Sequence, residues 1–250
     1  MAKTEKIVSF LNSELRIDVF RDSSHNGLQV ANSGHVKKVC CGVDASLEFF
    51  EAARERGANL LICHHGISWG DSLSMINGLN YDRVRYLIEN DMALYACHLP
   101  LDAHPVHGNN AQICDALDLR KRKPFGEYAG SLIGFRGQLA KPVSYDAFKN
   151  RIRKLVGQEI QSMDFGKKQI RSVGVISGGA ADGVEEAALQ GLDVFISGEP
   201  KLEAYIVAQQ LKVNAIFAGH YATETFGPRA LGRLVAETFK VQQEFIDFKI

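Results

Sequence analysis

Residues 51–63 read EAARERGANLLIC, and this stretch decides how the chain is built. A helix-forming segment comes first, Gly57 ends it, and the apolar run 60–63 that follows is typical of a short buried strand. Residues 185–197, EEAALQGLDVFIS, repeat the pattern at a constant offset of 134 positions. Either the chain contains two related α/β halves, which we favour, or two ordinary helix–glycine–strand units look alike.

The same alternation of strand and helix extends along most of the sequence. Expected strands cover 36–43, 60–63, 93–97, 172–176, 194–197, 215–218 and 244–248, and expected helices cover 4–15, 46–56, 81–90, 144–156, 183–190, 202–211 and 229–239. Residues 128–139 indicate antiparallel strands. The pattern predicts an α/β protein with mixed sheets flanked by helices, in two related halves at 1–125 and 126–250.

The composition is that of a globular protein with balanced charge. The 250 residues carry 29 Lys+Arg and 29 Asp+Glu, and this balance argues against an obligate nucleic-acid binder. The basic run at 121–123 is interpreted as a solvated loop. No apolar run approaches the roughly 18 residues of a membrane span, and residues 1–5 lack a signal-peptide pattern. The five cysteines fit reduced thiols. We therefore expect a cytoplasmic protein without a membrane partner.

Histidine is the most informative residue type. Three apolar runs end in histidine, and in two of them a carboxylate follows four residues later: His64 with His65, His98 with Asp102, and His220 with Glu224. In open α/β sheets, ligands collect at the carboxyl ends of the strands. Imidazole and carboxylate together suit iron, zinc or manganese. Adjacent strand residues point to opposite faces, so His64 and His65 can share a site only if the chain turns there.

Other polar residues give weaker indications. Asn26 and Gln29 lie in a segment that either lines a pocket or makes a turn, and Asn109 either caps the following helix or faces the pocket. Glu199 is either a carboxylate that supports the site, a proton-transfer group or a solvated loop acid. Trp69 either walls the pocket or closes the core.

Five separated motifs together resemble one known family. They are 26–30 (NGLQV), 63–66 (CHHG), 98–102 (HLPLD), 108–110 (GNN) and 219–224 (GHYATE). This set resembles the Ngg-interacting-factor-three-like family, which includes GTP cyclohydrolase type-two homologues and YbgI-like dinuclear metal proteins. The resemblance covers almost the whole chain. Gly66 stands where the family usually has proline.

The resemblance implies a site for two divalent ions in the cleft between the halves, and a ring-like homohexamer. The ligands that it implies are His64, His65, Asp102, His220 and Glu224, with Glu224 bridging the ions. His98 would lie nearby in the pocket. The identity of the metal, among iron, zinc and manganese, stays open.

Two functions follow from these residues. The first is a metal-dependent hydrolase of a small nucleotide-like or phosphorylated substrate, because two ions about 3.5–4 Å apart can activate water and polarise a substrate oxygen. His98 and Glu199 are its proton-transfer candidates, and Asn26, Gln29 and Asn109 its substrate-binding candidates. The second is a non-catalytic protein that stores, delivers or senses metal. A DNA-associated ring is disfavoured by the zero net charge.

Overall fold

The structure is a computed structural model that describes residues 1–248, and it contains two compact units. The first unit comprises Met1–Leu101 together with the described residues from Gly227 onward, and the second comprises Asp102–Phe226. These bounds differ from the halves 1–125 and 126–250, because the C-terminal strand pairs within the first unit's sheet. The relationship between the two halves as a repeat stays a prediction.

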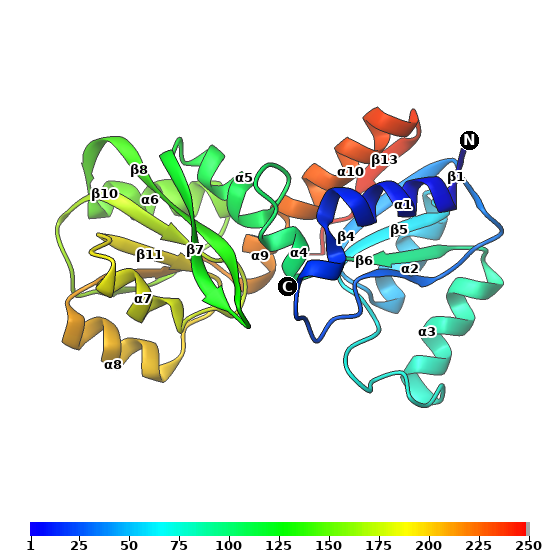
Figure 1. The fold of residues 1–250 in the computed structure, drawn as a ribbon, viewed down its shortest axis with the longest axis horizontal. Helices are drawn as coiled ribbons and strands as arrows, with labels where there is room; N and C mark the ends of the chain where they lie inside the picture. Colours follow the sequence, from blue (N-terminus) through cyan, green and yellow to red (C-terminus); the bar gives the residue numbers. More distant parts are fainter. Residues whose placement is uncertain (249–250) are drawn as a thin grey trace. The chain divides into compact units, whose positions relative to one another are not determined.

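The first unit is built on a five-stranded sheet with the order β13-β4-β5-β6-β2 (Figure 1). Its strands are β2 (Gly27–Val30), β4 (Lys38–Asp44), β5 (Leu60–His65), β6 (Ala93–Ala96) and β13 (Gln242–Phe245). β2 pairs antiparallel with β6, and the other neighbours are parallel. β1 (Ala2–Lys3) and β3 (His35–Val36) form a small antiparallel pair. The helices are α1 (Thr4–Leu15), η1 (Ile17–Val19), α2 (Leu47–Glu55), α3 (Gly78–Glu89), α4 (Leu99–Asp102) and α10 (Phe226–Phe239). The boundaries between the two units fall within α4 and α10.

Helices cover both faces of this sheet because its central strands are apolar on both sides. Cys41 and Ile62 face a core that also contains residues of α1 and α10, whereas Cys40 and Leu61 face a second core with residues of α2 and α3. Such continuous burial is typical of parallel strands. The sequence of β5, with four fully buried residues before His64, therefore places its histidines at the end of a rigid central strand.

The second unit is built on a six-stranded sheet with the order β7-β8-β10-β11-β12-β9. Its strands are β7 (Arg120–Tyr128), β8 (Ser131–Ser144), β9 (Gln161–Asp164), β10 (Gln169–Val175), β11 (Val194–Ser197) and β12 (Asn214–Phe217). β10, β11 and β12 are parallel, and β8 and β9 flank them in antiparallel pairing. The helices are α5 (Asn109–Ala116), α6 (Tyr145–Val156), α7 (Gly183–Leu189), α8 (Leu202–Leu211) and α9 (His220–Glu224).

The expected α/β class, with mixed sheets flanked by helices, is confirmed. Two local expectations were wrong. The basic run 121–123 lies in β7 instead of a loop, because that strand pairs along β8 and buries Phe125. Residues 27–30 form β2 instead of a turn, because β6 supplies an antiparallel partner. Within residues 1–248, no helix has both the length and the apolar character needed to cross a membrane.

Candidate metal centre

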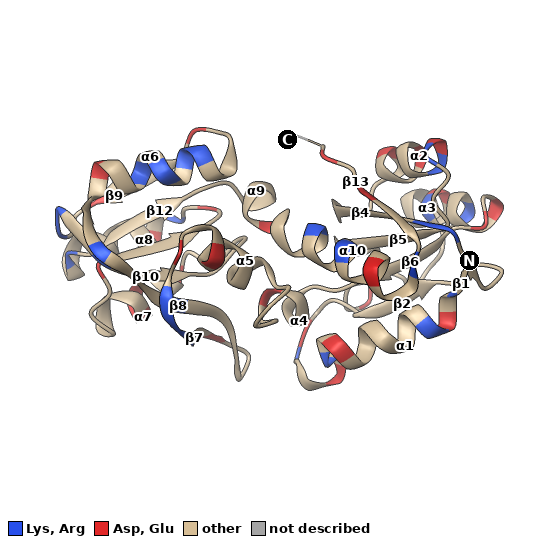
Figure 2. Cartoon of the chain, turned by 90° about the horizontal axis from the view of Figure 1, so that it is seen from above, with Lys and Arg blue, Asp and Glu red and all other residues tan. Residues whose placement is uncertain are grey.

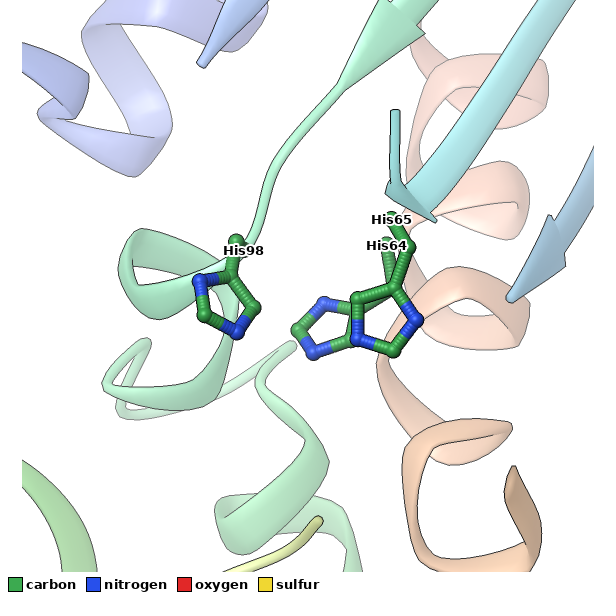
Figure 3. A group of neighbouring side chains, drawn as sticks. All are labelled: His64, His65 and His98. Atoms are coloured by element: carbon green, nitrogen blue, oxygen red, sulfur yellow. The ribbon is translucent and has the colours of Figure 1, made fainter. Parts of the chain in front are cut away.

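His64, His65 and His98 form one cluster in the first unit. The ring centroids of His64 and His65 are 4.8 Å apart, and the His98 ring lies 5.1 Å from the first and 5.6 Å from the second. Figure 3 shows the three rings gathered where β5 ends and where the chain leaves β6. One nitrogen from each ring lies within 4.8 Å of the other two. The side chains of the two adjacent histidines therefore lie close enough to offer donors to one site.

Each of these rings is held by an oxygen at Nδ1. His64 Nδ1 lies 2.9 Å from the Cys97 carbonyl, and His65 Nδ1 lies 2.8 Å from Asp44 Oδ1. His98 Nδ1 lies 2.9 Å from Asp22 Oδ1. A carbonyl or carboxylate oxygen can only accept a hydrogen bond, so Nδ1 donates in each pair and the neutral ring presents the lone pair of Nε2. Metal-binding histidines are usually oriented in this way.

Asp22 is a residue that the sequence reasoning missed. Its side chain is 2 % exposed, and its Oδ2 accepts from the backbone N–H of Leu99 and from Asn26 Nδ2, both at 3.0 Å. Burial raises the pKa of this carboxyl, but the contacts with His98, Asn26 and the Ser24 backbone outweigh it and lower the pKa to about 2. The negative charge beside His98 is therefore built into the fold, and no motif in the sequence marks it.

Asn26 and Gln29 support the loops that carry the histidines. Asn26 Oδ1 accepts from the backbone N–H of His98 at 2.7 Å. Gln29 Oε1 accepts from the backbone N–H groups of Ile67 and Ser68, just after the His64–His65 pair. A side chain at position 66 would collide with the Gln29 amide, so glycine is the residue that fits there. Their substrate-binding role stays a prediction.

Trp69 forms a wall beside the cluster. Its ring lies 4.9 Å from His98 and 5.8 Å from His65, measured between centroids. Its indole N–H donates to the Gly66 carbonyl at 2.8 Å, which fixes the ring. Cys63 and Cys97, which precede the histidines, are buried, and burial raises the pKa of the Cys63 thiol well above its usual range. The thiols are core residues, so the donors of this cluster are imidazole nitrogens.

His220 and Glu224 form a second group of donors, in the second unit. They lie one turn apart on α9, with His220 Nε2 3.1 Å from Glu224 Oε1. His220 Nδ1 lies 3.0 Å from Glu199 Oε1. The hydrogen bond with Glu224 is the largest influence on His220 and, with Glu199, it outweighs burial and raises the pKa of His220 to about 9. Glu199 and Glu224 thus contact the two different nitrogens of the His220 ring.

Asp102 is held by two neighbouring side chains of the second unit. It is 5 % exposed, and its Oδ1 accepts from Asn109 Nδ2 and from Ser177 Oγ, both at 2.9 Å. Asn109 begins α5 without making a side-chain cap, so its amide is directed to this carboxylate. Its substrate-binding role stays a prediction. Ser177, whose hydroxyl donates to Asp102, was not identified as a site residue from the sequence.

The donor chemistry of both units fits a divalent metal. Three oriented imidazoles lie in the first unit, and an imidazole with buried carboxylates lies in the second. Nitrogen and oxygen donors of this kind suit iron, zinc or manganese, whereas a structural zinc site usually contains cysteine. Every predicted metal ligand therefore has a neighbouring group that orients it or holds its charge.

Comparison with known proteins finds relatives along the whole chain. The family model Duf34/NIF3 (NGG1p interacting factor 3) matches residues 2–249. A "GTP cyclohydrolase 1 type 2 homolog" of Deinococcus radiodurans is 42% identical over 244 residues, covering 98% of this chain and 92% of the relative. The protein of that name from Pyrococcus horikoshii is also 42% identical, with 97% of both chains covered. The solved structure of "protein ybgI, unknown function" has a TM-score of 0.91, 32% identity and 99% coverage of both chains.

Proposed function

Because the chain belongs to the Duf34/NIF3 family, we propose that it is a dinuclear metal protein that hydrolyses a small nucleotide-like or phosphorylated substrate. One observation carries this proposal. Every histidine among its ligands has an oxygen at Nδ1, so the Nε2 atoms are oriented before any ion binds. Each of these contacts restricts a side chain and therefore costs conformational entropy, which an oriented ligand atom offsets when it binds an ion.

The proposed ligands are the five that the family resemblance implies: His64, His65, Asp102, His220 and Glu224. When bound, a pair of divalent ions supplies Lewis acidity and a deprotonated water at neutral pH. Five protein ligands leave coordination positions for water and substrate, which a structural site does not need. The names of these relatives, which call them cyclohydrolase homologues, support a hydrolytic reaction on a nucleotide-like substrate.

His98 and Glu199 are the proposed proton-transfer residues. Asp22 holds Nδ1 of His98, so Nε2 is the atom that accepts or returns a proton. Glu199 is exposed and contacts Nδ1 of His220, and it can pass a proton between that ring and solvent. Asn26, Gln29 and Asn109 are retained as proposed substrate contacts that act beside their structural hydrogen bonds. Trp69 excludes water from one side of His98.

The family resemblance also supports a ring-like homohexamer and a cytoplasmic location. Light scattering on the purified protein would test the oligomeric state, with a mass near six chains expected. A metal-storage, metal-delivery or metal-sensing role is the alternative to hydrolysis. It predicts rapid transfer of the bound metal to an acceptor apoprotein, and no turnover.

The first experiment is elemental analysis of protein purified without added metal, followed by a panel of phosphoesters, nucleotides and cyclic amides. We expect two equivalents of iron, zinc or manganese per chain and hydrolysis of one substrate class. His65→Ala and Glu224→Ala should lose both, and His35→Ala, which removes an exposed histidine, should lose neither. Protein that contains no metal and cannot be loaded would contradict the site. Activity that survives both ligand changes would contradict the reaction.

A further inference from the structure

Three cations lie close together on the hairpin of β7 and β8. Lys123 in β7 is directly opposite Arg136 in β8, and Lys121 lies at the register shift between these strands. Lys121 has a positive φ of 54°, which is unusual for a residue with a side chain. Figure 2 shows Lys and Arg in blue along this ribbon. Like charges placed directly opposite each other destabilise a strand pair, and an anion bound between them would offset this cost.

The three side chains line one cavity of about 170 Å³. The remaining lining residues are uncharged: Gly137, Gln138, Ser172 and Leu192. No carboxylate belongs to the lining among the residues that the structure describes. The cavity is smaller than the roughly 300–1,000 Å³ of pockets for drug-sized ligands, although it is several times the ~30 Å³ that one water molecule occupies in the liquid. Its volume suits a single small anion.

Two carboxylates of the second unit, Asp193 and Asp115, already have other partners. Asp193 accepts from the backbone N–H groups of Arg171 and Ser172, from the Ser172 hydroxyl and from Lys167 Nζ. Arg122 pairs with Asp115 and stacks over the Phe135 ring, a core residue on the other face of β8. Within residues 1–248, Lys121, Lys123 and Arg136 form no ion pair. Their positive charges are therefore not neutralised by the protein.

The position of this cavity separates it from the candidate metal ligands of the same unit. Ser172 comes just before the residues of β10 that pair with β11, and Leu192 lies just before β11 begins. Ser177 and His220, by contrast, follow the carboxyl ends of β10 and β12. Because these strands are parallel, the cavity is at their amino ends. A ligand bound there would be distinct from one bound by the metal ligands.

We propose that Lys121, Lys123 and Arg136 form a binding site for one tetrahedral oxyanion, the phosphate group of a small molecule or inorganic phosphate. Arg136 provides a planar fork of donors that matches two phosphate oxygens, and the two lysines provide ammonium groups. Gln138 adds a neutral polar group to the lining, whereas the Ser172 hydroxyl donates to Asp193 and is not available to the anion. The anion relieves the repulsion between Lys123 and Arg136. This proposal does not depend on metal binding or on hydrolysis.

The test measures binding of inorganic phosphate to the full chain by isothermal titration calorimetry, after metal has been removed with a chelator. Metal removal is essential, because bound divalent ions would themselves attract phosphate. We expect one phosphate per chain, and about tenfold or greater weakening in the double variant Lys123→Gln with Arg136→Gln. The single change Lys121→Gln, at an exposed residue, should weaken binding severalfold and serves if the double variant does not fold.

The matched control is the double variant Lys154→Gln with Lys168→Gln, which removes the same charge from exposed residues elsewhere in the second unit. It should bind phosphate like the wild type, and Lys123→Arg should retain binding. Equal weakening in the control and the cavity variants would overturn the proposal, as would no phosphate binding. Binding of an oligonucleotide with a steep salt dependence, without saturable binding of phosphate, would also overturn it in favour of a nucleic-acid surface.

Discussion

Asp44 Oδ1 lies 2.8 Å from Nδ1 of His65. The two residues are register partners at the ends of the parallel strands β4 and β5, so the sheet itself sets the contact. The Asp44 side chain is 46% exposed, and it is not part of the packed core. We therefore expect this carboxylate to act on the orientation of His65 with little influence on folding.

Replacing Asp44 separates ligand orientation from ligand identity. Asp44→Asn removes the charge that favours the Nδ1–H tautomer of His65, and we expect metal affinity to fall about 10–100-fold. The free energy of unfolding of the metal-free protein should change by less than about 0.5 kcal/mol, because the Asp44 side chain is nearly half exposed. Competition with a chromophoric chelator measures the affinity. Asp71→Asn, at an exposed loop residue, is the control, and an equal loss in both variants would contradict the argument.

Asp22 is buried, so its replacement should affect the free energy of unfolding more than the replacement of Asp44 does. Asp22→Asn weakens its contacts with His98, with Asn26 and with the backbone N–H of Leu99. We expect the free energy of unfolding to fall by about 1–3 kcal/mol, measured by urea denaturation of the metal-free protein. Asp18→Asn, at an exposed residue four positions earlier, should be neutral. An Asp22 variant as stable as the wild type would show that these contacts are weak in solution.

Much of the fold is predictable from the sequence because its parallel strands are uniformly apolar. The runs 60–63 and 194–197 are buried on both faces, and both were expected as strands. The hairpin of β7 and β8 was only partly predicted, because Arg120–Lys123 is polar and its strand conformation comes from pairing with β8. Local composition carries no information about such pairing.

The candidate site shows the same limit. His64, His65 and His220 could be found because strand-end histidines stand out against apolar runs. Asp22 and Ser177 could not, because they meet their partners across 76 and 75 positions of sequence, His98 in one case and Asp102 in the other. Ordinary polar residues in loops give no signal of such contacts until the chain is folded.

The lowered pKa of Asp193 predicts that the stability of the protein depends on pH. Burial raises the pKa of its carboxyl, but the contacts with Lys167, Ser172 and the Arg171 backbone outweigh burial and lower the pKa. A carboxyl whose pKa is lower in the folded state stabilises the protein above its unfolded value of about 3.9. That contribution disappears as pH falls below this value.

The corresponding measurement compares wild type with Asp193→Asn by urea denaturation at several pH values. At pH 7 the variant should be less stable by about 1–3 kcal/mol, and the difference should shrink as the pH falls below about 3.9. Asp182→Asn, which removes a 77% exposed carboxylate paired with Lys201, should show little difference at any pH. A difference for Asp193→Asn that stays constant down to pH 2 would rule out its charge as the cause.

Gly178 and Gly191 provide a matched pair of glycines for testing the second group of donors. Both have a φ of 69°, so an alanine at either position is strained by about 1–2 kcal/mol. They differ in what the new methyl group would meet. At Gly178 it would collide with the Glu224 carboxylate and approach His220, whereas at Gly191 nothing lies within 4 Å.

We therefore expect Gly178→Ala and Gly191→Ala to lose similar stability from backbone strain, and only Gly178→Ala to lose metal affinity, by at least tenfold. The displaced carboxylate could no longer hold both its contact with His220 and its place as a ligand. Thermal unfolding of the metal-free proteins and metal titration of each variant measure the two effects. If Gly178→Ala binds metal as tightly as Gly191→Ala, the packing of Glu224 against Gly178 has no influence on metal affinity.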